Sequence, residues 1–248
     1  MHLNDLLIIA AGFVAGLING VAGGGSMVSF PALVVIGLPA LQANVTSTVG
    51  IWSGYLGGAA GFRSELAAQP ARIRSLAPVA LAGAGVGAVL LLATPEDLFE
   101  DLAPILVLGA CALFAAQPLV ARRVRDGAAG SALRIARWGT FGAAIYGAYF
   151  GAGLGVILLA VLGLCIEDTL VRINGLRGLL ALLINSLAVV VFVVAADVAW
   201  RYAALLAVSS LVGGYTGARV SRRLPTPVLR GVVLGFGVSA GVIMLVGT

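Results

Sequence analysis

Ten apolar segments follow one another along the chain, separated by short polar or charged stretches. They cover residues 5–21, 26–38, 44–62, 75–93, 103–121, 135–150, 155–166, 173–196, 199–218 and 228–247. A helix rises about 1.5 Å per residue and the hydrocarbon core of a bilayer is about 30 Å thick, so most of these segments are long enough to cross it. The pattern predicts an all-α integral membrane protein.

Two of the segments are too short to cross a membrane as single helices. Segments 26–38 and 155–166 would reach only about 18–20 Å. Each follows a glycine run, Gly23–Gly25 or Gly151–Gly155, and the two runs begin 128 residues apart. A short, glycine-interrupted segment in matching places of both halves is the best pointer in a sequence to a transporter's binding site. We expect eight full spans plus half-helices, or ten segments if both hairpins cross fully.

The two halves are weakly similar to each other. At the offset of 128 positions, seven residues meet identical residues: Phe13, Ala15, Gly23, Gly25, Val28, Ala32 and Gly50. Each half consists of a glycine-broken hairpin followed by three spans, so the second half begins on the opposite side of the membrane from the first. The sequence therefore predicts two inverted repeats, residues 1–125 and 126–248, within one membrane domain.

Composition supports a membrane location. The chain is 60% apolar and only 10% charged, with a mean hydropathy of +1.10, whereas soluble proteins carry about 25% charged residues. The basic residues are 15 arginines without any lysine, and they gather in short loops, as the positive-inside rule requires. We expect a multi-pass protein of the bacterial inner membrane with both termini extracytoplasmic, without a cleaved signal peptide and without nucleic acid as a partner.

The glycine runs are the first candidates for chemistry. A helix that begins at Ser26 or Val156 leaves several N–H groups without partners inside the helix, and an anion can accept them near the positive end of the helix dipole. The alternative is that the glycines only permit tight hairpins, and that asparagines act as helix caps. The candidate substrate-binding residues are Asn19, Gly23, Gly24, Gly25, Ser26, Asn44, Thr46, Ser47, Tyr146, Gly151, Gly153, Gly155, Asn174 and Arg177.

Arg177 is the sharpest single candidate, because it lies inside an otherwise apolar segment. A mid-membrane arginine costs about 2.5–3.5 kcal/mol on insertion scales and usually faces a cavity or a partner. Its guanidinium suits the oxygens of sulfite, a sulfonate or a carboxylate. Two alternatives stay open, namely snorkelling to the interface and pairing with Glu167 or Asp168.

The sequence offers little for catalysis or for metal binding. His2 is the single histidine, and the two cysteines, Cys111 and Cys165, have no metal-ligand spacing. No nucleophile motif or phosphate-binding loop is visible. We therefore expect no catalytic residue, no metal and no cofactor, and a protein that is not an enzyme.

Two signatures, one in each half, resemble the TauE/SafE sulfite-exporter family, and the resemblance covers nearly the whole chain. They are Gly12–Asn19, Ala22–Ser26, Phe30–Leu33 and Ala43–Ser47 in the first half, and Tyr146–Gly155, Glu167–Asp168 and Arg172–Arg177 in the second. The resemblance implies two homologous halves and a permease for sulfite, sulfonates or related organosulfur acids. The chain departs from the family pattern at Ile173, where alanine is usual, and at Arg177, where lysine is frequent.

Together these features predict an exporter or permease for small sulfur-containing anions, working by alternating access at a midplane site between the repeats. Its partners are then a small anionic substrate and the lipid bilayer, with a homo-oligomer left open. A permease for another small organic anion, such as a carboxylate, is the alternative. There are two further alternatives: a membrane enzyme of sulfur metabolism built around Cys165, and a subunit without a transport path. The direction of transport and the coupling ion stay open.

Overall fold

The computed structural model describes residues 3–21, 23–125 and 133–220, together with nine positions between 231 and 245. Every element in these residues is an α-helix, and no strand occurs among them. In chain order the helices are α1 (Leu3–Val21), α2 (Ser26–Val35), α3 (Ala40–Gly61), α4 (Arg63–Ala67), α5 (Pro70–Ala93), α6 (Glu96–Arg125), α7 (Leu133–Tyr149), α8 (Leu154–Cys165), α9 (Leu170–Ala195) and α10 (Trp200–Val220). The all-α prediction is confirmed.

Nine of the ten predicted segments correspond to helices. The segment 228–247 lies largely outside the described residues. Three helical stretches are long and apolar enough to cross a membrane within the described part of the chain: Pro70–Ala93, Glu96–Ala116 and Leu170–Ala195. Helix α6 begins seven residues before the predicted segment, because acidic side chains such as Glu96 and Asp97 favour the first turn of a helix.

The helices pair reciprocally between the two halves of the chain. Helix α10 packs along α1 and α3, and α5 packs along α7 and α9. Each half therefore gives one helix to the other half. Glycine makes these approaches close: a Cβ atom at Gly16 would lie 2.1 Å from the carbonyl oxygen of Ser210, and one at Gly87 would lie 2.1 Å from that of Ile145. Such close contacts between backbones are typical of helices packed in lipid.

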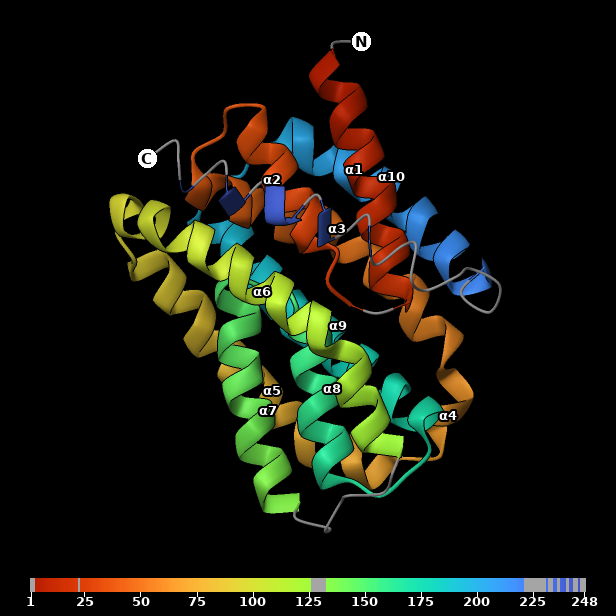
Figure 1. Ribbon diagram of the computed structural model, residues 1–248. Coiled ribbons are helices and arrows are strands. Elements are labelled where there is room, and N and C mark those ends of the chain that lie inside the picture. The colour runs from red at the N-terminus through yellow and green to blue at the C-terminus, as the bar shows by residue number, and fades with distance from the viewer. Residues whose placement is uncertain are drawn as a thin grey trace.

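Helix α9 runs antiparallel to α3 through the middle of the bundle. The indole nitrogen of Trp52 donates to Ser186 Oγ at 2.8 Å, and Gln42 Nε2 donates to Asp197 Oδ2 at 2.7 Å just beyond the end of α9. With 26 residues, α9 is about 39 Å long. Figure 1 shows α6 crossing the front of the bundle diagonally, with α1 and α10 on one side and α5, α7 and α8 on the other.

The two predicted hairpins form around the glycine runs. Helix α2 has 10 residues and α8 has 12, so they reach about 15 and 18 Å. All residues of α2 from Ser26 to Leu33 are buried. A chain break at membrane depth is tolerated where protein surrounds it, and here Phe30 of α2 packs edge-on against Phe150 beside the second break, at 5.3 Å between ring centroids.

Candidate functional site

The two glycine breaks lie against each other. A Cβ atom at Gly23 would lie 3.0 Å from the Cα atom of Gly155, and one at Gly151 would lie 3.5 Å from Ser26 Oγ. The φ angles of Gly23, Gly151 and Gly153 are between +70° and +79°, a region that favours glycine strongly over other residues. The breaks therefore bring the N-terminal ends of α2 and α8 to one place, with Gly25 and Gly153 as the residues that precede the two helices.

Asn19 of α1 caps the first break. Its Oδ1 atom accepts hydrogen bonds from the backbone N–H groups of Gly24 at 3.1 Å and Gly25 at 2.7 Å. These two donors are thus held by the protein itself, as in the capping alternative. The side chain of Asn19 is buried and also interacts with the hydroxyl of Tyr55.

Two side chains hold the second break in a similar way. The hydroxyl of Tyr146 donates to the carbonyl oxygen of Ala152 at 2.7 Å, inside the break. Asn44 Nδ2, at the beginning of α3, donates to the carbonyl oxygen of Tyr149 at 2.9 Å. Because Asn44 belongs to the first half and Tyr149 to the second, this hydrogen bond joins the halves beside the break.

The remaining candidates divide into those close to the breaks and those outside them. Ser47 Oγ lies 2.6 Å from Ser29 Oγ, which also donates to the carbonyl oxygen of Gly25 at 3.3 Å. Thr46 instead accepts from the backbone N–H of Ala199 at 3.0 Å, where the link between α9 and α10 passes. Asn174 is half-buried and makes no side-chain hydrogen bond within the described part of the chain. Thr46 and Asn174 are therefore not grouped with the breaks.

Arg177 is buried, with 5% of its surface exposed, about 11 Å along α9 from its beginning. Its charge acts on the buried hydroxyl of Tyr55, which also interacts with the side chains of Asn19 and Asn185. We call these four residues the Arg177 cluster. It draws on α1 and α3 from the first half and on α9 from the second, and Asn19 connects it to the first glycine break.

Asn185 and Tyr55 were not among the sequence candidates. Asn185 is 3% exposed, donates to the carbonyl oxygen of Ala181 at 2.8 Å, and lies two turns after Arg177 on the same side of α9. A spacing of eight residues between two polar side chains in an apolar span is a signal that could have found it. Tyr55 lies on another helix, so its place beside Arg177 follows from how α3 packs on α9.

Ion pairs join the two halves at both ends of α9. At its N-terminal end, Asp168 pairs with Arg72 of α5, and also with Arg172 at 3.4 Å. Burial raises the pKa of Asp168, but the hydrogen bond from Arg72, the N–H of Thr169 and the two positive charges together bring it below its ordinary value. Beyond the opposite end of α9, Arg201 of α10 pairs with Asp5 of α1 at 2.8 Å.

The chain is similar in sequence to proteins described as probable membrane transporters. The chain is 32% identical over 120 residues to a probable membrane transporter protein, ORF9, of Sinorhizobium sp., a match that covers 47% of this chain and 44% of that protein. It is 24% identical over 221 residues to a probable membrane transporter protein of Haemophilus influenzae, with 87% of this chain and 85% of that protein covered. No solved structure matches significantly.

The family comparison covers more of the chain than either relative. Residues 8–244 match the sulfite exporter TauE/SafE family, so the match takes in most of α1, all of α2 through α10, both glycine breaks and the Arg177 cluster. The protein therefore belongs to the sulfite exporter TauE/SafE family of membrane transporters.

Proposed function

We propose that the protein is a permease of the inner membrane for small sulfur-containing oxyanions such as sulfite or organosulfonates, and that the anion binds at the Arg177 cluster. The observation that carries this proposal is the buried guanidinium of Arg177 beside Tyr55, Asn19 and Asn185. An arginine within a membrane usually faces a cavity or a partner, and its guanidinium can donate hydrogen bonds to an anion that enters from water.

The chemistry of the cluster favours an oxyanion over a spherical anion. A guanidinium presents N–H donors in a planar fork that matches two oxygens of one ligand. Amide and hydroxyl groups next to it add neutral donors for further oxygens. The carboxamide of Asn19 is buried beside the hydroxyl of Tyr55, and sulfite and sulfonates offer several oxygens on one sulfur atom.

We propose that the two halves are inverted repeats and that both termini are extracytoplasmic. Transport would then proceed by alternating access between the two halves. The cluster is built from both halves, so a rocking motion between them alters access to it from one side and then from the other. The ion pairs Asp168–Arg72 and Asp5–Arg201 lie on opposite sides of the cluster along α9 and also join the halves. Each pair ties an exchanged helix, α5 or α10, to the half on which it packs, and we expect it to restrain opening at the end where it lies.

The test is thermal unfolding of the purified protein in detergent at constant ionic strength, with sulfite, methanesulfonate, acetate or chloride as the added anion. A ligand present at about 100 times its Kd stabilises the native state by about 2.7 kcal/mol, so sulfite or the sulfonate should raise Tm. Arg177→Gln should abolish that rise. Arg74→Gln, which removes an exposed arginine from α5, is the matched control and should keep it.

Two results would contradict the proposal. Equal shifts with chloride and sulfite would mean that the protein responds to ions in general. A larger shift with acetate than with either sulfur anion would point to a carboxylate permease. Uptake of sulfite labelled with sulfur-35 is then measured in proteoliposomes that contain the wild-type protein or Arg177→Gln. This comparison connects binding to transport.

A further inference from the structure

Two grooves open on the outer surface of the bundle at corresponding places in the two halves. The α1/α10 groove, of about 650 Å³, is lined from α1 by Leu6, Ile9, Ala10 and Phe13. The α5/α7 groove, of about 590 Å³, is lined from α7 by Arg134, Arg137, Trp138 and Phe141. Each of these α7 positions lies 128 residues after its α1 counterpart, which is the offset of the two glycine runs.

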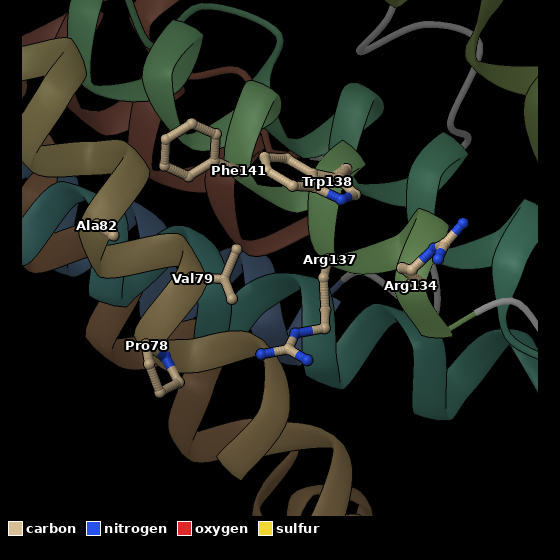
Figure 2. Close-up of a pocket in the computed structure, with 7 residues that line it drawn as sticks. All are labelled: Pro78, Val79, Ala82, Arg134, Arg137, Trp138 and Phe141. Atoms are coloured by element: carbon tan, nitrogen blue, oxygen red, sulfur yellow. The ribbon is translucent and has the colours of Figure 1, made fainter.

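The grooves match in place and size but differ in charge. The α1/α10 groove has apolar side chains and one serine, Ser209. The α5/α7 groove has an apolar floor from Val79, Ala82 and Phe141, with Arg134 and Arg137 at one end. In Figure 2 the side chain of Arg137 extends into the space between α7 and α5, and Arg134 stands one turn earlier on α7.

Neither arginine of the α5/α7 groove has a hydrogen bond or an ion pair within the described residues, and both are exposed. A spacing of three residues places them on one face of α7. Trp138 next to them is 71% exposed and packs edge-on against Phe141 at 6.2 Å between ring centroids. Exposed tryptophan at the end of a membrane helix is typical of the level of the lipid headgroups.

We propose that the α5/α7 groove is a binding site for an anionic phospholipid. The phosphate binds between Arg134 and Arg137, and one acyl chain lies along Val79, Ala82 and Phe141. Basic pockets between membrane helices recognise anionic headgroups in this way. The uncharged α1/α10 groove has the shape for an acyl chain but has no arginine for the phosphate.

A lipid fits this groove better than a soluble anion does. A soluble anion would contact the two arginines only and leave the apolar floor uncovered. Apolar side chains also continue along the surfaces of α5 and α7, where Leu81, Leu90 and Ile135 are exposed. Because α5 belongs to the first half and α7 to the second, a lipid in this groove contacts both halves.

The experiment compares phosphatidylglycerol with phosphatidylcholine bound to the delipidated protein, counted by native mass spectrometry. Two interfacial charges at about 1 kcal/mol each correspond to a preference of roughly 30-fold for phosphatidylglycerol in the wild-type protein. The double variant Arg134→Gln/Arg137→Gln should lose most of it. The matched control Arg63→Gln/Arg74→Gln removes two exposed arginines outside the groove and should keep it.

Each result either supports or overturns the proposal. It is wrong if the wild-type protein binds both lipids equally, or if the control variant loses as much preference as the groove variant. It is also wrong if free glycerol phosphate displaces phosphatidylglycerol completely, since the acyl chain then adds nothing. The variant Arg134→Lys/Arg137→Lys keeps both positive charges, so it should keep the preference for phosphatidylglycerol. This variant tests the proposal even if the glutamine variant does not fold.

Discussion

The side chain of Asn19 contacts both the first glycine break and the Arg177 cluster. Its oxygen caps the first glycine break through Gly24 and Gly25, and the side chain also interacts with Tyr55 of the Arg177 cluster. A change at this one residue therefore affects the shape of the break and the proposed anion site together.

We expect Asn19→Ala to destabilise the protein by about 1–2 kcal/mol, because two buried N–H groups lose their acceptor. The measurement is Tm in detergent without added anion. Asn4→Ala is the control, since it makes the same change at an exposed position of the same helix. A Tm for Asn19→Ala that equals that of Asn4→Ala would show that the two hydrogen bonds contribute nothing.

At the residue scale the sequence predicted which groups are buried better than which groups meet. Arg177 stood out because a charge inside an apolar span needs a special environment. Asn44 and Tyr146 are predicted as substrate ligands, and in the structure their donors bond to backbone carbonyls beside and within the second break. The Asn44 hydrogen bond spans 105 positions of the chain, so no local pattern contains it, whereas Tyr146 reaches only six residues ahead.

At the scale of elements, the glycine breaks are closely packed corners. A Cβ atom at Gly25 would lie 2.4 Å from the carbonyl oxygen of Ala15, and at Gly23 the positive φ angle excludes most other residues as well. The breaks were predictable because glycine runs and short apolar segments are visible in the sequence. Helix α4 was not predicted, since five residues that include charged ones give no periodic pattern.

We expect Gly25→Ala to destabilise the protein by about 1–3 kcal/mol, as overpacking usually does. The physical reason is that the added methyl group meets backbone, which cannot rotate away. Gly142→Ala is the control, because nothing lies within 4 Å of its Cβ position, and alanine is favoured over glycine in a helix by about 0.5–1 kcal/mol. The measurement is urea or thermal unfolding in detergent, and equal stability of the two variants would contradict the expectation.

At the scale of the whole molecule, an ion pair between residues of the two sequence halves lies near each end of α9. Asp168→Asn should favour opening at the N-terminal end of α9, and Asp5→Asn should favour opening at the other end. Because the folded pKa of Asp168 lies below its ordinary value of about 3.9, its stabilising effect is complete above that value. It is lost as the pH falls through the lowered pKa.

Labelling of single cysteines by a membrane-impermeant maleimide measures this opening. The background is Cys111→Ala/Cys165→Ala, which removes both buried native thiols. Ser64→Cys on α4 reports on the end near Asp168, and Asn4→Cys reports on the end near Asp5. We expect each Asp→Asn variant to raise labelling several-fold at its own end and to lower it at the other. A rise at both ends for either variant would indicate general loosening instead of alternating access.

The exchange of α5 and α10 between the halves has a consequence for how the protein is made. Helix α1 leaves the ribosome early, but its packing partner α10 begins only at Trp200. At about 5–20 residues per second, α1 waits roughly 10–40 s in the bilayer before α10 can cover the face that packs on it. We therefore expect α1 of a newly inserted chain to stay bound to the insertion machinery. We expect its release to follow the synthesis of the last helices.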